Sequence, residues 1–448
     1  MSQAASPRRI AVVGAGVVGM TTALALQRQG HAVSVLDPQG PGEGASYGNA
    51  GFLATELIDP LSTPATLRQA PRLWLAPHGA LALPLRYLPR LAPWLVRFIA
   101  AARPFQVTKG RQALAALNGA AVAAWRRCLA DIGAEEELLP SGYLLVWQSG
   151  RGRAAAKAKM AHLERWGQEV EWLEAAALRK REPGLTGTLS HGLYFPGAHQ
   201  VRDPHALVRR LAAAFEARGG ELCRMRVNRL EPRGEGVRLH TDAGALDADR
   251  AVVAAGAWSH QLAAGLGLSI PLETERGYHL TLPQRGQALR QPVGSAERRF
   301  VMTPMRCGLR VVGFTELGGL WLSPVKRRYA SLRHHAEALL RDPAGLDEGA
   351  EEWMGFRPTL PDSLPVIDTH PDYPVVHFAF GHQHLGLTQA AITAELLAAR
   401  MAGEAPALDL SPYRVTRFPG CRGRRQETGR CPAYRRSRQD SAGHPANA

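Results

Sequence analysis

Hydrophobic residues near the N-terminus follow the order strand, helix, strand. Residues 10–13 form an apolar run of strand length, and the Ala- and Leu-rich stretch 20–29 has the composition of a helix. Gly30 is a stop signal for that helix, and the next apolar run, 33–36, ends at Asp37. This order predicts a βαβ unit at the start of the chain.

Helical and strand patterns also alternate farther along the chain. Residues 60–104 carry eight prolines among Leu, Trp and Arg, which predicts short helices broken by proline. Residues 105–182 have a mainly helical pattern with one strand near 143–147. Two more helices are predicted at 204–218 and 389–401, and strands at 237–240, 250–254, 311–313 and 375–380.

The glycines between the first strand and the first helix form the pattern G-x-G-x-x-G. Gly14 permits a tight turn, Gly16 lets the backbone approach a pyrophosphate, and Gly19 lets helix and strand pack closely. The N-terminus of the helix then offers free N–H groups to phosphates. Asp37, at the end of the second strand, can accept hydrogen bonds from ribose hydroxyls. The pattern predicts a dinucleotide site but does not choose between NAD and FAD, and an ordinary βαβ turn is the alternative.

A second loop of small residues, GASYGNAG at 44–51, follows Asp37. It resembles the A-S-x-x-N-A-G loop of the D-amino-acid oxidase-like FAD-dependent oxidoreductases. Other segments resemble further motifs of that family: AAGAWS at 254–259, ERGYHL at 275–280, GFTEL at 313–317, GFRP at 355–358 and GHQHLGLT at 381–388. The Pro- and Leu-rich region is most similar to bacterial D-amino-acid dehydrogenases of the small-subunit type. The resemblance covers nearly the whole chain up to Phe418.

The resemblance implies a non-covalent FAD that lies along the 44–51 loop, and no Cys or His stands at an evident flavin-attachment position. The segment 381–388 would lie over the flavin, where N–H groups before a helix can stabilise negative charge. The backbone of Val227 would meet the adenine. The cofactor-binding residues expected in this way are Gly14, Gly16, Val17, Val18, Gly19, Asp37, Ser46, Asn49, Ala50, Gly51, Val227, Gly256, Trp258, Gly381, His382, Gly386, Leu387 and Thr388.

Arg357 is the expected clamp for a substrate carboxylate, because a guanidinium group can bind a carboxylate through two parallel hydrogen bonds. The alternative is a solvated arginine or an internal ion pair. Tyr278 and Arg276 are weaker candidates for the same site, and Glu316 is expected to be a structural partner. His384 could face the flavin ring, although a loop histidine is more often structural. No spacing of His or Cys predicts a metal site.

The resemblance implies an α/β fold in which a Rossmann-type FAD-binding domain is interleaved with a substrate domain built on a large mixed sheet. The FAD-binding domain is expected at 1–66, 201–271 and 351–418, the substrate domain at 67–200 and 272–350, and a disordered basic tail at 419–448.

The implied activity is oxidation of a D-amino acid by hydride transfer to flavin N5. The products are a 2-oxo acid and ammonia, or a cyclic imine from a proline-like substrate. Two alternatives stay open: a sarcosine- or glycine-type oxidase that uses oxygen, and a flavin subunit that only relays electrons.

The formal net charge of +15 allows nucleic acid, an acidic membrane or an anionic substrate as partners. The tail contributes seven arginines against two acidic residues, and no basic stripe interleaved with aromatics favours nucleic acid. Five scattered cysteines and a polar N-terminus without a signal peptide predict a protein of the reducing cytoplasm.

The region 60–104 also raises the question of a membrane contact. Its Trp, Phe and Leu residues alternate with Arg68, Arg72, Arg86, Arg90 and Arg97, a composition that can bind at a membrane interface. Its longest uncharged stretch, 73–85, is too short to span a bilayer, which takes about 20 residues. One hypothesis is peripheral contact with the cytoplasmic face of the inner membrane, with a quinone as electron acceptor. The alternative is that these helices only cap the substrate domain.

Overall fold

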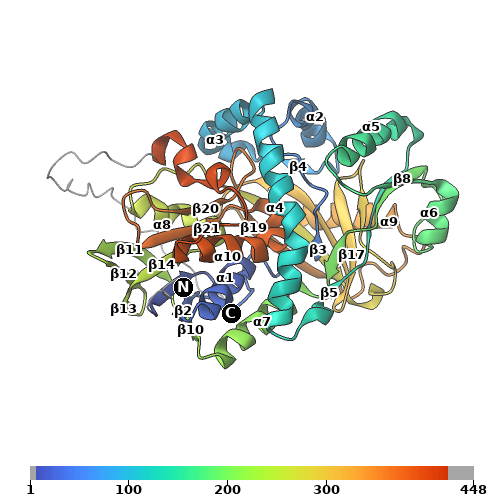
Figure 1. Ribbon diagram of the computed structural model, residues 1–448. Helices are drawn as coiled ribbons and strands as arrows, with labels where there is room; N and C mark the ends of the chain where they lie inside the picture. Colours follow the sequence, from blue (N-terminus) through green and yellow to red (C-terminus); the bar gives the residue numbers. More distant parts are fainter. Residues whose placement is uncertain (1–6, 422–448) are drawn as a thin grey trace.

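The computed structural model describes residues 7–421, and the chain folds around two large sheets (Figure 1). The predicted βαβ unit is present as β1 (Arg9–Val13), α1 (Val17–Arg28) and β2 (Ala32–Leu36). Four of the five β1 side chains are buried, as expected for a central strand covered on both faces.

The first sheet has six strands in the order β10-β2-β1-β14-β21-β20. The added strands are β10 (Glu221–Cys223), β14 (Arg250–Val253), β20 (Val366–Thr369) and β21 (Val376–Phe380). All are parallel except β20, which pairs antiparallel with β21 at one edge. The carboxyl ends of five parallel strands therefore share one edge, where doubly wound folds bind ligands.

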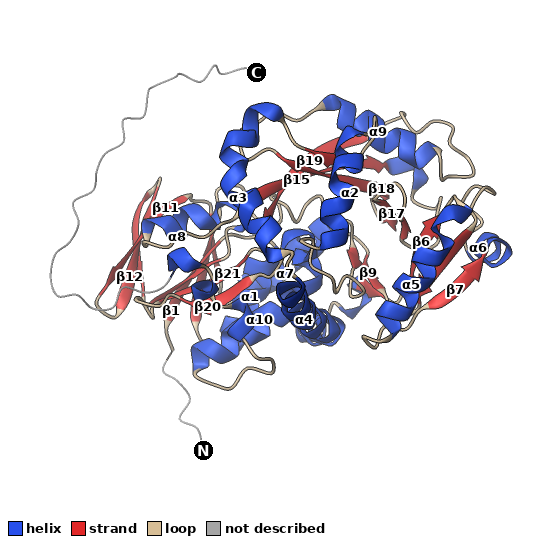
Figure 2. Cartoon of the chain, turned by 90° about the horizontal axis from the view of Figure 1, so that it is seen from above, coloured by secondary structure: helices blue, strands red, loops and turns tan. Residues whose placement is uncertain are grey.

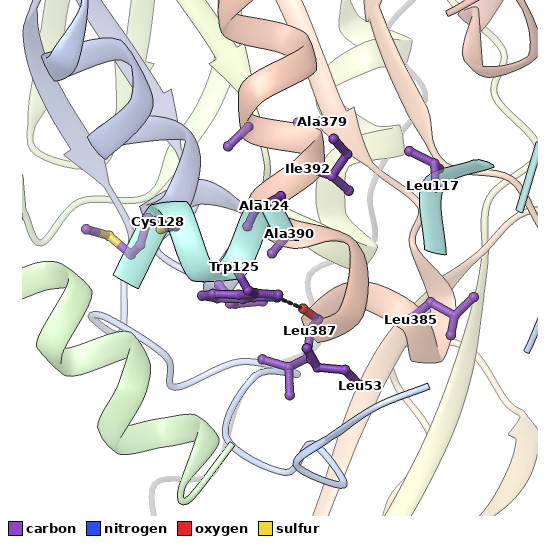
Figure 3. Close-up of a cluster of buried hydrophobic side chains, with 14 of the residues drawn as sticks. Leu53, Leu117, Ala124, Trp125, Cys128, Ala379, Leu385, Leu387, Ala390 and Ile392 are labelled. Carbon is purple, nitrogen blue, oxygen red and sulfur yellow. Dashed lines mark hydrogen bonds between the residues drawn. The ribbon is translucent and has the colours of Figure 1, made fainter. Parts of the chain in front are cut away.

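The helices α4 (Pro104–Asp131) and α10 (Gly386–Ala402) pack together beside α1 (Figure 1). Trp125 of α4 is fully buried, and its Nε1–H donates to the carbonyl of Leu387 at 2.8 Å (Figure 3). Apolar side chains from several segments surround this contact, including Leu53, Leu117 and Ile392. The long helix α4 thereby fixes the first turn of α10, which lies next to the candidate site.

The second sheet is large and mixed, as the resemblance implies. It runs β19-β15-β18-β17-β16-β6-β8-β7, with β4 paired to β18. Its strands are β4 (Leu81–Ala82), β6 (Tyr143–Trp147), β7 (Glu171–Glu174), β8 (His191–Phe195), β15 (Glu273–Leu282), β16 (Val293–Ser295), β17 (Phe300–Met305), β18 (Gly308–Leu317) and β19 (Glu351–Thr359). Every residue of β15 is buried, because α9 (Lys326–Glu337) covers one face of this strand and the 44–51 loop contacts the other, where His279 Nδ1 lies 3.3 Å from the carbonyl of Gly48.

Figure 2 shows the two sheets side by side. The remaining strands form two three-stranded sheets: β11 (Val227–Arg233), β12 (Gly236–Thr241) and β13 (Gly244–Ala248); and β3 (Phe52–Leu53), β9 (His199–Val201) and β5 (Leu138–Leu139). The remaining helices outside the region 60–104 are α5 (Arg153–Glu164), α6 (Ala175–Arg181), α7 (Pro204–Ala217) and α8 (Ser259–Gly265). The strands β11 and β12 lie at one end of the molecule, and β7 lies at the other end with α5 and α6 (Figure 2).

The region 60–104 differs from its prediction in one respect. Helices α2 (Pro64–Leu75) and α3 (Leu88–Ala101) continue through internal prolines, Pro71 and Pro93, so these prolines do not break them. α2 buries none of its residues, and α3 buries only Leu91 and Trp94. Most of both helices is therefore held at the surface.

The two sheets draw on alternating segments of the chain, but one expected boundary is wrong. The strand β19, placed by sequence in the last FAD-binding segment, pairs with β15 in the second sheet. Most of the expected basic tail lies outside the described residues. Within residues 7–421, no helix is long and apolar enough to cross a membrane.

Candidate cofactor and substrate site

A cavity of about 440 Å³ extends from the carboxyl edge of the first sheet to the face of the second. Its lining includes the glycine loop, the 44–50 loop, residues 381–387, and parts of β15 and β19. All the cofactor-binding residues expected from sequence line it except Gly19, Gly51 and Thr388. The structure thus brings together segments that are up to about 370 residues apart in the chain.

The three glycines of the first loop have different physical roles. Gly14 has φ of +110°, and a Cβ there would lie 2.5 Å from the carbonyl oxygen of Ala254. A Cβ at Gly19 would lie 1.9 Å from the carbonyl oxygen of Gly14, so both glycines are needed for the loop to pack. At Gly16 a Cβ would meet only the Ser46 hydroxyl, at 3.4 Å. Gly16 lines the cavity, so this open space fits the close approach of a pyrophosphate.

Asp37 supports the same loop from the end of β2. Its Oδ2 accepts the backbone N–H of Ala15 at 3.0 Å, and its Oδ1 accepts those of Gln39 and Gly40 at 2.8 and 3.1 Å. A carboxylate has about four lone-pair positions, so Asp37 can still accept a hydrogen bond from a ribose hydroxyl. The predicted ribose role is compatible with this geometry, and Asp37 has a structural role beside it.

The second loop is tied to both sheets. The hydroxyl of Ser46 accepts the N–H of Val17 at 3.0 Å, at the start of α1. The guanidinium of Arg310, in β18, donates to the carbonyls of Tyr47 and Asn49 at 2.9 and 3.3 Å. Sequence reasoning missed Arg310, which holds the loop against the second sheet.

Thr388 and Gly51 act behind the cavity. The Thr388 hydroxyl accepts the N–H of Ala54 at 3.0 Å, and Gly51 donates its N–H to the Asn49 side chain at 2.9 Å. Gly19 packs against Gly14 as described above. These three residues shape the backbone of the site and do not line it, which corrects their expected contact with the cofactor.

The two histidines of the segment 381–388 differ in their surroundings. His382 is buried, its Nε2 lies 2.9 Å from the Thr393 hydroxyl, and burial lowers its pKa to about 3. His384 is less buried and also lines the cavity. Burial lowers the pKa of His384, Glu275 opposes this effect, and Arg357 adds to it. Both rings are therefore neutral at physiological pH, and neither adds positive charge next to a substrate amine.

Arg357 lies in the cavity wall and also forms the internal ion pair that sequence analysis gave as its alternative role. Its Nη1 donates to Glu275 Oε1 at 2.9 Å and to the carbonyl of Phe314 at 3.0 Å. The guanidinium lies over Gly277, where a Cβ would be 2.3 Å from Cζ, so a side chain there would displace it. Among residues 7–421, no partner for Nε or Nη2 is found. That edge of the guanidinium matches the two oxygens of a carboxylate.

Glu275 was not identified from the sequence, although it fixes Arg357. Its side chain is only 4% exposed, and its two oxygens also accept the hydroxyl groups of Thr315 and Thr359 at 2.8 and 3.2 Å. Burial raises the pKa of Glu275, but Arg357, His384 and the two hydroxyls together bring it below its ordinary value. The carboxylate is therefore ionised, and it orients the guanidinium from behind the cavity wall.

Tyr278 and Arg276 lie on the opposite face of β15 from the cavity, because side chains alternate along a strand. The Tyr278 hydroxyl donates to Glu316 at 3.3 Å, and Arg276 pairs with Glu316 at 2.7 Å. All three side chains are almost fully buried. The structure contradicts a substrate contact for Tyr278 and Arg276, and it agrees with the structural role expected for Glu316.

The geometry fits a dinucleotide whose far end reaches Arg357, and no group of His, Cys, Asp and Glu in the described part of the chain could hold a metal. The chain is 34% identical over 419 residues to a D-amino-acid oxidase of Bradyrhizobium diazoefficiens, covering 92% of this chain and 99% of that protein. It is 32% identical over 429 residues to a D-amino acid dehydrogenase of Chromohalobacter salexigens, covering 92% and 99%.

Solved structures share the fold. Glycine oxidase from Geobacillus kaustophilus superposes with a TM-score of 0.68 at 24% identity, covering 92% of this chain and 99% of that chain. L-proline dehydrogenase from P. horikoshii superposes with a TM-score of 0.69 at 17% identity, covering 92% and 98%. The family model described as FAD dependent oxidoreductase matches residues 9–400. The chain therefore belongs to the DAO family of FAD-dependent oxidoreductases.

Proposed function

We propose that this protein oxidises the Cα–N bond of a small D-amino acid, with FAD as its cofactor. The observation that carries the proposal is the free edge of Arg357 in the wall of the FAD cavity, held from behind by Glu275. The names of relatives that are 34% and 32% identical over nearly the full length add the D-amino-acid class.

The residues of the site perform binding and alignment rather than acid–base chemistry. Arg357 would bind the α-carboxylate through Nε and Nη2, because Nη1 is already held by Glu275 and Phe314. The neutral His382 and His384 leave the substrate amine without a repelling charge. Bound FAD supplies the hydride acceptor. The substrate loses the α-hydrogen and one amine proton to give an imine, and water converts the imine to a 2-oxo acid and ammonia.

The test is an anaerobic screen in which the flavin absorbance of the purified protein is followed with D- and L-amino acids, glycine, sarcosine and hydroxyproline isomers. The expected result is rapid bleaching by one or more D-amino acids, with no added partner protein. Bleaching by glycine and sarcosine alone would replace this proposal with an amine oxidase. No bleaching by any of these compounds would favour an electron-relay subunit.

Oxygen as electron acceptor is tested separately, because relatives of similar identity are named both oxidase and dehydrogenase. We propose that the acceptor is a membrane quinone, and that dehydrogenase activity exceeds oxidase activity. The expected result in air is slow reoxidation with little peroxide, and fast reoxidation with a soluble quinone analogue. Stoichiometric peroxide at the turnover rate would contradict this part of the proposal.

We also propose that helices α2 and α3 bind peripherally to the cytoplasmic face of the inner membrane. Large apolar side chains are exposed on these helices (Trp74, Leu75, Val96 and Ile99), on the turn between them (Leu85) and at the start of α4 (Phe105). Among them, Leu75 and Leu85 are 76% and 71% exposed. Such a surface can enter the headgroup layer, and nearby arginines would add attraction to anionic lipids.

The membrane proposal is tested by flotation with anionic liposomes. A chain ending at Cys421 removes the contribution of the basic tail, and it should still float at low salt. A variant carrying Leu75→Glu and Ile99→Glu should stay at the bottom of the gradient while keeping its flavin. If the truncated parent chain also stays at the bottom, the helices are only a lid over the substrate domain.

A further inference from the structure

A second hollow, of about 210 Å³, lies at the edge of the first sheet opposite the glycine loop. Arg8 precedes β1, Arg250 begins β14, and His377 is the second residue of β21. Arg400, in the last turn of α10, completes the basic part of the lining. These residues lie at the amino ends of the parallel strands, whereas the FAD cavity lies at their carboxyl ends. The proposed deamination therefore makes no use of this hollow.

The hollow carries more positive than negative charge. Arg400 pairs with the carboxylate of Asp368 at 2.8 Å. Among the residues that the structure describes, Arg250 donates only from Nη1, to the backbone carbonyls of Glu235 and Asp249. For the side chain of Arg8, no hydrogen bond or ion pair is found between residues 7 and 421.

Asp249, one of the two acidic groups whose charge acts on Arg250, is already engaged outside the lining. Asp249 accepts the backbone N–H of Arg9 at 2.8 Å and its guanidinium at 3.5 Å. Arg8 and Arg250 line the same hollow. Burial and the positive charge of Arg8 lower the pKa of Arg250, whereas Asp249 and Glu235 act in the opposite direction. Two positive charges therefore face the hollow, and neither forms an ion pair with a carboxylate between residues 7 and 421.

His377 adds a hydrogen-bond donor to the hollow. Its Nδ1 lies 3.0 Å from the hydroxyl of Thr369, and that hydroxyl also accepts the Nε–H of Arg400 at 3.1 Å. The hydroxyl can give its single proton to Nδ1, and the proton of a neutral His377 then sits on Nε2. Burial and the three arginines lower the pKa of His377 to about 3, so the ring is neutral. Its Nε2 is buried with no partner among the described residues.

His31, in another part of the wall, also has Nδ1 occupied by a hydrogen bond from a neighbouring group. Its Nδ1 accepts the backbone N–H of Arg8 at 3.4 Å, which leaves the proton of a neutral ring on Nε2. Burial and Arg8 lower the pKa of His31. The lining thus combines cationic groups with neutral N–H donors that have no acceptor in the described part of the chain, and this is the donor set of an anion site.

We propose that this hollow binds a phosphate-type dianion, either inorganic phosphate or the phosphate group of a small metabolite. Its two negative charges match the two unpaired arginines. Its tetrahedral oxygens can accept hydrogen bonds from elements on several sides at once, namely the start of β1, β14, β21 and the residue before β2. The hollow has several times the volume of one water molecule, about 30 Å³. A phosphate group therefore fits inside it.

The test uses full-length protein saturated with FAD, titrated with inorganic phosphate in an isothermal calorimeter at constant ionic strength. Saturable binding of one phosphate per chain is expected, together with a rise in melting temperature. Arg8→Ala should weaken the affinity by about tenfold or more, because it removes a charge-assisted hydrogen bond. Arg209→Ala is the matched control: it removes one positive charge from an exposed residue of α7 that lies outside the lining. Its affinity should equal that of the parent protein.

A second variant addresses the buried donor. His377→Phe keeps a planar aromatic ring and removes Nε2–H, and it should weaken phosphate binding while the flavin spectrum stays unchanged. Titration with ribose 5-phosphate separates the two sources: tighter binding than inorganic phosphate indicates a metabolite, and weaker binding indicates the free ion. Absence of saturable binding, or equal losses in Arg8→Ala and Arg209→Ala, would overturn the proposal. The arginines would then serve only to offset the carbonyl ends of nearby helices.

Discussion

Replacing Arg357 by lysine separates a substrate clamp from a merely structural arginine. The change keeps the positive charge next to Glu275, so the buried carboxylate retains a partner. It removes the planar group whose Nη1 binds Glu275 and Phe314 while Nε and Nη2 remain for a ligand. A lysine ammonium that takes over the contact with Glu275 cannot also bind two carboxylate oxygens in one plane.

The expected loss follows from the hydrogen bonds removed. A hydrogen bond to a charged group contributes about 1.5–3 kcal/mol, and two such bonds to the substrate are lost while part of the Coulomb attraction is kept. A net loss of about 2–4 kcal/mol corresponds to a decrease in kcat/KM of roughly 30- to 1,000-fold. FAD content should not change, because Arg357 lies at the end of the cavity away from the glycine loop.

The measurement is the rate of anaerobic flavin reduction in a stopped-flow instrument, at several concentrations of the best D-amino acid from the screen. Arg328→Lys is the matched control, because Arg328 lies 3.3 Å from Glu316 on the other face of the sheet. That variant should keep its kcat/KM within about twofold, as expected for a change away from the substrate. An Arg357→Lys protein with full flavin content and unchanged kcat/KM would refute the clamp.

Three further predictions concern the cofactor, the clamp and pH. Gly16→Val should fold and lose FAD, because a side chain there fills the cavity without overlapping the backbone; a fully yellow variant would contradict this. Glu275→Gln should bind a simple carboxylate such as propionate about tenfold more tightly, because the substitution removes the negative charge that competes for Arg357. Binding is measured by flavin absorbance, and weaker binding would contradict this prediction and show that Glu275 acts mainly by orienting the guanidinium. Below pH 6.5, stability should fall with pH, because three buried histidines with pKa values near 3 must become protonated on unfolding: His279, His377 and His382. Burial raises the pKa of Glu56 to about 7, so protonation of this carboxyl group stabilises the folded state as the pH falls from about 7 to 4.5. The free energy of unfolding, measured with urea between pH 5 and 6, should therefore change by roughly 3 kcal/mol per pH unit.

The sequence by itself determined the cofactor-binding end of the site. The spacing of Gly14, Gly16 and Gly19 between a strand and a helix is a local pattern, and a local backbone conformation follows from it. Asp37 could be placed for the same reason, since it ends the strand that immediately follows. The family motifs then identified FAD and the later segments that line the cavity, and the matching family model confirms the cofactor.

The tertiary structure decided the substrate end. Sequence reasoning treated Arg276, Tyr278 and Arg357 as candidates for one site. It could not separate them, because the face of the sheet on which each side chain lies depends on how the strands pair. In the sheet, Glu275 lies opposite Arg357 across two neighbouring strands, while Tyr278 faces the helix behind them. Glu275 and Arg357 are 82 residues apart in the chain, and no local pattern couples them. Their ion pair, and the guanidinium edge that it leaves free, exists only because β15 and β19 pair in this register.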